Sequence, residues 1–182
     1  MVNPDPSSPH RKNLRIPDFD YSQPGSYYVS IVTQGRRKLF GQIVDGEMVL
    51  NDIGKMVEEV WVAIPEHFPN VELGEFVVMP NHFHGVITIT VGARHAVPRP
   101  VSEKEGFGKP VSGSLSTILR SFKSATTKAF HEFSRDSEDR LWQRSFYEHV
   151  IQNERDYRAI YEYIVANPMN WEMDDEFNSK KG

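Results

Sequence analysis

The sequence predicts an α+β sandwich, in which helices pack on one side of an antiparallel sheet. Segments with strand character alternate with segments of helical spacing, and neighbouring strand segments are joined by short turn signals. The 182 residues include no cysteine, so thiolate chemistry, cysteine-based zinc sites and disulfides are excluded. A chain of this size buries about two-thirds of the surface that it exposes when unfolded, which is enough for one hydrophobic core.

Composition divides the chain into an N-terminal arm, one domain and a C-terminal tail. Residues 1–20 are rich in proline, serine and charge, so we expect a flexible arm there. We expect a single domain over residues 21–171, with a loop insert at 92–112, where glycine, proline and alternating charge show no periodicity. Residues 172–182 are acidic and polar, and we expect a tail.

Five segments contain β-branched and aromatic residues in the proportions typical of strands. They are residues 27–33, 41–50, 71–79, 82–91 and 144–150. Asp45-Gly46 separates two apolar runs and predicts a tight hairpin within the second segment. Pro80-Asn81 is a turn dipeptide, so it predicts a direct connection between the third and fourth strands.

Three segments repeat their apolar residues at intervals of three and four, which places these residues on one face of a helix. They are residues 53–64, 114–133 and 153–166. Asn51 or Asp52 is expected to cap the first helix, and Pro65 is expected to end it. The last helix is expected to end at Asn167-Pro168, because the residue before a proline is disfavoured in helical geometry. In the second helix the expected apolar stripe runs from Leu115 to Phe133.

The formal net charge of -4 conceals two oppositely charged segments. Residues 56–93 contain five acidic residues and no lysine or arginine, whereas residues 94–131 contain seven basic residues and two acidic ones. The net charge alone argues against a nucleic-acid-binding protein, but phosphate binding depends on the local field. The second expected helix carries three basic residues outside its apolar stripe: Arg120, Lys123 and Lys128. They are candidate phosphate contacts, with an ordinary solvated helix face as the alternative.

The longest nearly uncharged stretch, residues 76–93, contains two histidines, an asparagine and a proline. Such a stretch fits neither a membrane span nor a signal peptide. A soluble, cytoplasmic protein is therefore expected.

The most distinctive local sequence is MPNHFHGVITI, in which His82 and His84 are one residue apart at the start of an expected strand. Because side chains alternate between the two faces of a strand, both imidazoles should project from one face and Phe83 from the other. Two neighbouring imidazoles can bind a metal ion, although two surface histidines beside a turn have the same spacing. A metal site needs a third ligand from elsewhere in the chain.

The last expected helix, ERDYRAIYEYIVANP, contains three tyrosines. Tyr157 and Tyr161 follow the apolar stripe, so we expect both in the core. Tyr163 lies about 100° from the centre of this stripe, and Asn167, four residues later, lies on the same flank. A phenol and an amide are thus expected to face outward together. The alternative is a partly exposed tyrosine beside an ordinary Asn-Pro helix end.

A tyrosine combined with a histidine pair is suited to phosphoryl transfer. A tyrosine can attack a DNA phosphate and form a phosphotyrosine ester, which stores the energy of the broken phosphodiester for rejoining. Two imidazoles and an amide oxygen leave positions open for phosphate oxygens and water. Such a site suits Mg²⁺ or Mn²⁺, with Zn²⁺ and Cu²⁺ as tighter-binding competitors.

Four segments resemble the single-tyrosine HUH transposases, a family of insertion-sequence type named for a His-hydrophobe-His motif, and within it the REP-associated tyrosine transposases. The segments are VVMPNHFHGVI, LSTILRSFKS, LWQRSFYEHVIQNERDYR and YIVANPMNW, and the resemblance spans residues 27–171. It implies a ferredoxin-like or RRM-like fold. It also implies a DNA transposase that cleaves and rejoins single-stranded DNA near hairpins, with a 5′-phosphotyrosine intermediate and a free 3′-hydroxyl.

The resemblance implies a role for each residue of the two motifs. Tyr163 matches the catalytic nucleophile, His82 and His84 match the metal ligands, and Asn167 matches a third metal ligand, with Mg²⁺ or Mn²⁺ as the cofactor. The implied partner is single-stranded DNA that contains a hairpin. The implied oligomeric state is a monomer or a homodimer that exchanges its tyrosine helix.

Residues 142–144 (WQR) are further candidates for DNA contact. Gln143 and Arg144 can hydrogen-bond to an unpaired base, and Trp142 can stack on it, although a core position is the commoner role for such a tryptophan. We do not expect His149 to be a fourth metal ligand. Two other functions remain open at this point: a non-catalytic nucleic-acid-binding protein with the same fold, and a metal-dependent hydrolase of small phosphoesters.

Overall fold

The computed structural model describes residues 23–90 and 111–171. Four strands form an antiparallel sheet in the order β4-β5-β1-β6, and two more form a separate hairpin, β2-β3. The strands are β1 (Gly25–Val32), β2 (Gly41–Val44), β3 (Glu47–Leu50), β4 (Val71–Met79), β5 (His82–Ile89) and β6 (Tyr147–Ile151). The predicted α+β class with an antiparallel sheet is confirmed.

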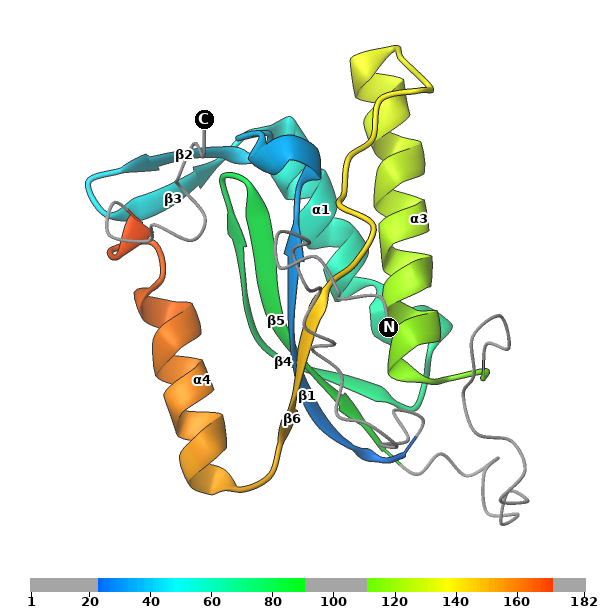
Figure 1. The fold of residues 1–182 in the computed structure, drawn as a ribbon, viewed down its shortest axis with the longest axis vertical. Helices are drawn as coiled ribbons and strands as arrows, with labels where there is room; N and C mark the ends of the chain where they lie inside the picture. Colours follow the sequence, from blue (N-terminus) through cyan, green and yellow to red (C-terminus); the bar gives the residue numbers. More distant parts are fainter. Residues whose placement is uncertain (1–22, 91–110, 172–182) are drawn as a thin grey trace, which may run out of the picture.

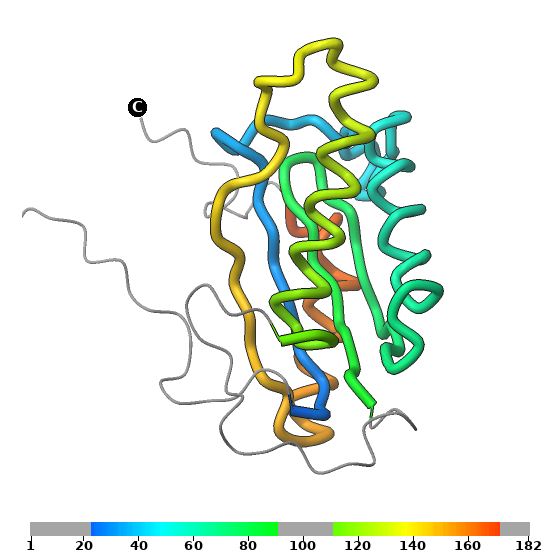
Figure 2. The backbone as a smooth tube through the Cα atoms, turned by 90° about the vertical axis from the view of Figure 1, so that its right-hand side faces the viewer, coloured from blue at the N-terminus to red at the C-terminus, as the bar shows by residue number. Residues whose placement is uncertain are grey.

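Helices cover both faces of the sheet. The helices are α1 (Asp52–Val62), α2 (Ile64–His67), α3 (Leu115–Ser134) and α4 (Glu154–Ala166), with a short 3₁₀ turn, η1 (Gln34–Arg36). In Figure 1, α1 and α3 lie on one side of the strands and α4 lies on the other. Figure 2 shows the same arrangement from the side, with α1 and α3 in front of the strands and α4 behind them. The prediction that all helices pack on one side is therefore wrong for α4.

The alternation of side chains along β1 explains why both faces are covered. Tyr27, Val29 and Ile31 belong to the large core with α1 and α3, whereas Tyr28 packs with Val86 and with α4 on the other face. Because apolar side chains emerge on both sides of this central strand, each side needs a helical cover.

The large core is built around three aromatic rings. The ring of Trp61 from α1 lies 4.4 Å from that of Phe83 and 5.3 Å from that of Phe122, measured between centroids. Phe83 is therefore on the face opposite the second core, as the alternation along β5 predicts. The side chains of His82 and His84 therefore lie on the other face of β5.

The second core, beneath α4, is small. Ile164 is buried in it against Tyr28 and Val86, and Tyr157 is partly buried beside them. Tyr161, which we expected in the core, is 43% exposed. Because α4 packs on this face without a neighbouring helix, the stripe that it buries is narrow and excludes Tyr161.

The apolar stripe of α3 also ends earlier than predicted. Phe130 is buried, but Phe133 is exposed. In Figure 1 the C-terminal end of α3 projects beyond the strands. The last turn of this helix therefore has no sheet to pack against.

Local signals fixed most of the turns and helix ends. Asp45 and Gly46 have φ values of 51° and 80°, the left-handed pair that a two-residue hairpin requires. Asn51, Ser114 and Asn153 each cap a helix through a side-chain oxygen. The first helix ends at Val62, before the predicted boundary, and Pro65 lies in the first turn of α2, where a proline is tolerated.

Three strands have boundaries that differ from the predicted ones: β1 spans Gly25–Val32, β5 ends at Ile89, and β6 spans Tyr147–Ile151. The expected arm (1–20), the expected tail (172–182) and most of the expected loop insert (92–112) lie outside the described residues. Within the described ranges, no helix has the length and apolar character needed to cross a membrane.

Candidate active site

The two histidines of β5 form the centre of the candidate site. His82 and His84 are both fully buried, and their ring centroids are 4.5 Å apart. Both lie on the face of the sheet that α4 covers, since the neighbouring Val86 belongs to the second core. The predicted side-by-side arrangement is confirmed, whereas a pair of surface histidines is not what the structure shows.

The turn before β5 fixes the tautomer of His82. Asn81 Nδ2 donates to the carbonyl oxygen of Arg36 at 3.3 Å, so its Oδ1 faces His82 Nδ1, 2.8 Å away. An amide oxygen is only an acceptor, so Nδ1 of His82 must carry the proton and donate it. The other ring nitrogen, Nε2, then bears the lone pair that a metal ligand needs.

His84 lies between two phenols. Its Nδ1 is 2.7 Å from the hydroxyl of Tyr28, and its Nε2 is 3.4 Å from the hydroxyl of Tyr163. The rings of Tyr28 and His84 are stacked with centroids 5.6 Å apart. Tyr28 comes from β1 and Tyr163 from α4, so the sheet and the helix meet at this imidazole.

Tyr163 is half-exposed, although its hydroxyl touches a buried histidine. The side chain is 43% exposed, and its ring makes an edge contact with that of Tyr28 at 6.3 Å. This position agrees with the predicted displacement of Tyr163 from the apolar stripe. A phenol in such a place is accessible to a large substrate and is oriented by the protein.

Asn167 is buried, so the prediction that it faces outward with Tyr163 is wrong. It is the C-terminal cap of α4 and is only 3% exposed. The chain that follows folds back over the sheet, where Trp171 packs on Met79 and stacks on the His82 ring at 5.8 Å. This return segment covers Asn167 and encloses the histidine pair from one side.

Burial keeps both imidazoles neutral. Burial lowers the pKa of His82 to about 3; hydrogen bonding with the Asn167 side chain opposes this shift, and the positive charge of Arg36 adds to it. Burial also holds the pKa of His84 well below its usual value, and the neighbouring His82 lowers it further. Neutral imidazoles are the form that binds metal ions.

The amide oxygen of Asn167 is better suited to bind a metal ion than to form a hydrogen bond with His82. Its Oδ1 is buried and has no hydrogen bond of standard geometry from the described residues, although it lies near enough to the His82 ring to oppose the lowering of the His82 pKa. With the His82 proton on Nδ1, Nε2 of His82 and Oδ1 of Asn167 are two acceptors on neighbouring side chains, and a cation satisfies both. No group of three or more His, Cys, Asp or Glu side chains within residues 23–90 and 111–171 is arranged to hold a metal, so the donor set is two imidazoles and one amide.

Comparisons with known proteins identify relatives of this chain. No family model matches the sequence. The chain is 38% identical over 167 residues to an uncharacterized protein of Haemophilus influenzae, an alignment that covers 91% of this chain and 92% of that protein. The two proteins therefore belong to one family.

A second protein of the same organism, provisionally named a REP-associated tyrosine transposase, is 25% identical over 150 residues, which cover 82% of this chain and 73% of the relative. A solved structure, described as a REP-associated tyrosine transposase bound to a REP hairpin, aligns with a TM-score of 0.55 and 22% identity over 83% of this chain and 70% of that chain. The chain has the fold of a REP-associated tyrosine transposase. The resemblance noted in the sequence is thus confirmed.

In this transposase fold, the basic residues of α3 lie on the opposite side of the sheet from the histidine pair. Helix α3 covers the sheet face opposite to α4, so Arg120, Lys123 and Lys128 are not brought to Tyr163. Arg120 and Lys128 are exposed. Lys123 donates from Nζ to the carbonyl oxygens of Gln143 and Arg144 at 2.7 and 3.1 Å, and burial lowers its pKa to about 8. Lys123 thus connects α3 to the segment before β6.

The structure places Trp142 in the core of the transposase fold, so the alternative in which it stacks on a base is wrong. It is buried, and its Nε1 donates to Thr126 Oγ1 at 2.8 Å. Gln143 Nε2 donates to the carbonyl oxygen of Thr33 at 3.3 Å, whereas Arg144 is exposed. DNA contact by Gln143 or Arg144 stays a prediction.

His149 lies outside the candidate site. Its Nε2 pairs with Asp156 at 2.9 Å, and this hydrogen bond lowers the pKa of the Asp156 carboxyl. The pair joins β6 to the first turn of α4. It therefore holds the helix on the sheet, and the expectation that His149 is not a fourth ligand stays a prediction.

Four residues of the candidate site were not predicted from the sequence: Tyr28, Arg36, Asn81 and Trp171. Asn81 directly precedes the His82 position, so its role was detectable from local spacing. Tyr28 reaches His84 only through the antiparallel register of β1 and β5, in which Ser30 is paired with His84 and Tyr28 with Val86. That register is not readable from a single segment.

Proposed function

We propose that this protein is a metal-dependent single-strand DNA endonuclease and strand transferase in which Tyr163 is the nucleophile. The observation that carries the proposal is the position of the Tyr163 hydroxyl, 3.4 Å from Nε2 of a buried, neutral histidine. A half-exposed phenol next to two imidazoles and a buried amide oxygen is the arrangement that phosphoryl transfer to tyrosine needs. The similarity to REP-associated tyrosine transposases supports this reaction class.

The proposed cleavage forms one bond and breaks another. The Tyr163 oxygen attacks the phosphorus of a phosphodiester, and the bond from phosphorus to the 3′ oxygen of the preceding nucleotide breaks. The phenolic proton passes to solvent, to which Tyr163 is open, and the leaving 3′ oxygen is protonated. The products are a 5′-phosphotyrosine on the protein and a free 3′-hydroxyl. Attack by a 3′-hydroxyl on the phosphotyrosine reverses these changes and joins two strands.

The protein residues supply position and electrostatics. His82, His84 and Asn167 would hold Mg²⁺ or Mn²⁺, which polarises the scissile phosphate when bound. Asn81 and Tyr28 orient the two imidazoles from behind. Because the histidines are buried and Tyr163 is not, the scissile phosphate has to approach from the side of α4 on which Tyr163 is exposed.

The proposed substrate is single-stranded DNA that carries a hairpin. The solved structure with a similar fold is described as bound to a REP hairpin, and the same class of substrate suits the present chain. An unpaired strand is also what the geometry favours, since the scissile phosphate must reach a phenol beside a buried cluster.

The test is a covalent trapping experiment. The full chain is mixed with a labelled hairpin oligonucleotide that has single-stranded flanks, in Mg²⁺ or Mn²⁺, and the mixture is separated under denaturing conditions. We expect a protein–DNA adduct that EDTA, Tyr163→Phe and His82→Ala each abolish. Tyr161→Phe is the matched control, because Tyr161 lies on the same helix with the same exposed fraction, 43%.

Each other result identifies a different function. An adduct formed by Tyr163→Phe overturns the assignment of the nucleophile. Hairpin binding with neither adduct nor metal dependence indicates a non-catalytic binding protein. Turnover of a generic phosphodiester by Tyr163→Phe indicates a hydrolase of small phosphoesters.

A further inference from the structure

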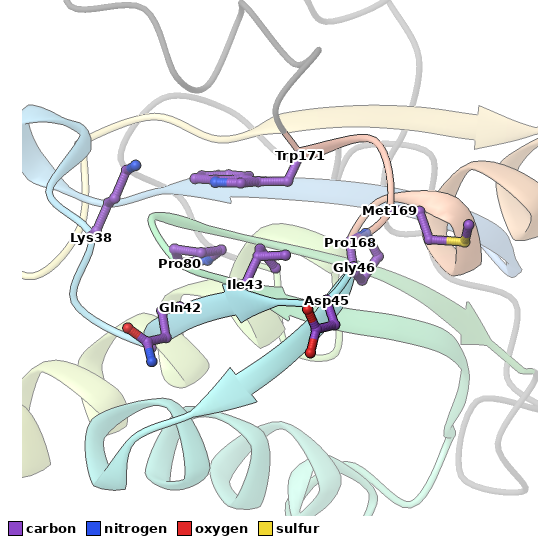
Figure 3. Close-up of a pocket in the computed structure, with 10 residues that line it drawn as sticks. Lys38, Gln42, Ile43, Asp45, Gly46, Pro80, Pro168, Met169 and Trp171 are labelled. Atoms are coloured by element: carbon purple, nitrogen blue, oxygen red, sulfur yellow. The ribbon is translucent and has the colours of Figure 1, made fainter.

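A polar groove opens beside the candidate active site. It lies between the β2-β3 hairpin and the segment that follows α4, and it has a volume of about 790 Å³. Figure 3 shows Trp171 and Met169 on one side of it and the hairpin residues on the other. The polar and apolar side chains that line it include Lys38, Gln42, Asp45, Pro80, Met169 and Trp171.

The groove is structurally continuous with the proposed metal ligands. Pro80 lies two residues before His82 in the turn that connects β4 to β5. Trp171 forms a wall of the groove and stacks on the His82 ring. Pro168, which also lines the groove, directly follows Asn167. A strand held at the histidine pair therefore has the groove as its immediate neighbour.

Positive charge lies along the segment that connects β1 to β2. The Lys38 ammonium is 5.3 Å from the centroid of the Trp171 ring, and its side chain is exposed. Arg36, two residues earlier, is near enough for its charge to lower the pKa of His82. One cation thus lines the groove and the other lies near His82, where both can attract phosphate groups.

The remaining lining suits an unpaired base. Met169 is 78% exposed, and a thioether makes favourable contacts with aromatic rings. Gln42 and Asp45 offer an amide and a carboxylate, which hydrogen-bond to base edges. The volume falls within the range of about 300–1,000 Å³ that is typical of small-ligand sites. A base in a duplex is paired and stacked, so only an unpaired base can enter.

We propose that this groove binds a nucleotide of the single-stranded DNA that flanks the scissile phosphate. The base lies between the hairpin and Met169, and a phosphate contacts Lys38. This inference rests on the proposed function, because it assigns a subsite to the same substrate. It adds a region of the chain, residues 38–46, that has no part in the proposed chemistry.

The first experiment measures binding without chemistry. In the Tyr163→Phe background, fluorescence anisotropy gives the affinity for a hairpin with single-stranded flanks and for the same hairpin with blunt ends. We expect Lys38→Ala combined with Gln42→Ala to weaken binding of the flanked hairpin by roughly fivefold to tenfold. The affinity for the blunt hairpin should stay the same. Lys55→Ala is the matched control, because Lys55 is exposed on α1, which covers the other face of the sheet.

The second experiment locates the base. Oligonucleotides with a photoreactive thymine analogue at successive flank positions are cross-linked to the full chain and mapped by mass spectrometry. We expect one flank position to label the peptide containing Met169 and Trp171. The groove assignment is overturned if the double variant binds both hairpins as the parent does, or if the cross-links map to other segments.

The two proposals fail in distinguishable ways. If adducts form in the wild type but the double variant keeps full affinity for the flanked hairpin, the groove is wrong and the proposed function stands. If no adduct forms with any oligonucleotide, the proposed function fails, and the anisotropy measurements still decide whether the groove binds DNA.

Discussion

The hydroxyl of Tyr28 lies 2.7 Å from Nδ1 of His84, in the same relation to this ring as Asn81 Oδ1 has to His82. If Nε2 of His84 is to bind a metal ion, Nδ1 must keep its proton and donate it to the Tyr28 oxygen. Tyr28 is thus in a position to orient the second ligand, and because a hydroxyl both donates and accepts, it can support the tautomer that metal binding requires. It is a positioning residue, since it acts through His84.

Replacing Tyr28 by phenylalanine should weaken metal binding and leave the ring packing in place. We expect the affinity for Mn²⁺, measured by titration calorimetry, to fall by about 10–100-fold, as for other changes to the partners of metal ligands. Nitrogen NMR of the labelled imidazoles should show a changed Nδ1 environment for His84 and an unchanged one for His82. Tyr147→Phe is the control, because Tyr147 is an exposed neighbour of the Tyr28 ring. Equal affinities in the two variants would contradict the role of Tyr28.

Asn167→Leu should abolish metal binding and leave the protein folded. It removes a buried acceptor that has no hydrogen bond of standard geometry from the described residues, so we expect the metal-free variant to lose at most about 1 kcal/mol of stability relative to the wild type. Mn²⁺ should raise the melting temperature of the wild type and leave that of the variant unchanged, because ligand binding stabilises only a protein with the site. A variant that still gains stability from Mn²⁺ would show that Asn167 is not a ligand.

The metal-free protein should lose stability in mild acid. The pKa of His82 is lowered to about 3, and that of His84 is also lowered, whereas unfolded histidine titrates near 6.5. Below pH 6.5 the unfolded chain takes up protons that the folded chain excludes. The free energy of unfolding should therefore be constant above about pH 7 and fall below it, by at most about 1.4 kcal/mol per pH unit for each histidine.

Urea titrations in EDTA between pH 4.5 and 7.5 measure this effect. The lower limit keeps the carboxyls of Asp139 and Asp156 out of the measurement, because their lowered pKa values remove stability only in stronger acid. His82→Phe should reduce the slope, and His67→Ala, at an exposed position on α2, should not. An unchanged slope in His82→Phe would mean that His82 is not buried in its neutral form.

Gly85 should tolerate no side chain. A Cβ there would lie 2.6 Å from Trp61 Cζ2 and 2.9 Å from Phe83 Cε1. We expect Gly85→Ala to lower the free energy of unfolding by about 1–3 kcal/mol, because two packed rings must move. Chemical denaturation measures the change, with Ser124→Ala on the exposed face of α3 as the control. A loss no larger than that of the control would show that the rings yield freely.

The fold was predictable where the signal is local. The β-branched and aromatic content and the turn dipeptides located the strands, and the spacing of apolar residues placed the start of the last helix near Asn153, which caps α4. The side of the sheet on which α4 packs was not predictable, because it depends on which apolar face of β1 the other helices leave exposed. The exposure of Tyr161 follows from the same packing.

The candidate site was predictable in its residue types and only in part in its geometry. The spacing of His82 and His84 is a property of one strand, and the spacing of Tyr163 and Asn167 is a property of one helix. The burial of Asn167 depends on the return of residues 168–171 across the sheet. The distance between α3 and the site depends on which face of the sheet each helix covers. The basic residues of α3 do not reveal that face.

The proposed nucleophile and one proposed ligand share α4, whereas both histidines belong to β5. Helix α4 is held by a small core and by the His149–Asp156 pair, so it can detach with a smaller free energy than global unfolding requires. Detachment removes Tyr163 and Asn167 from the histidines in one event and leaves the rest of the domain folded. If Tyr163 and Asn167 act as proposed, activity depends on the docking of α4 on the sheet, and it is lost at a temperature at which the sheet and the large core are still intact.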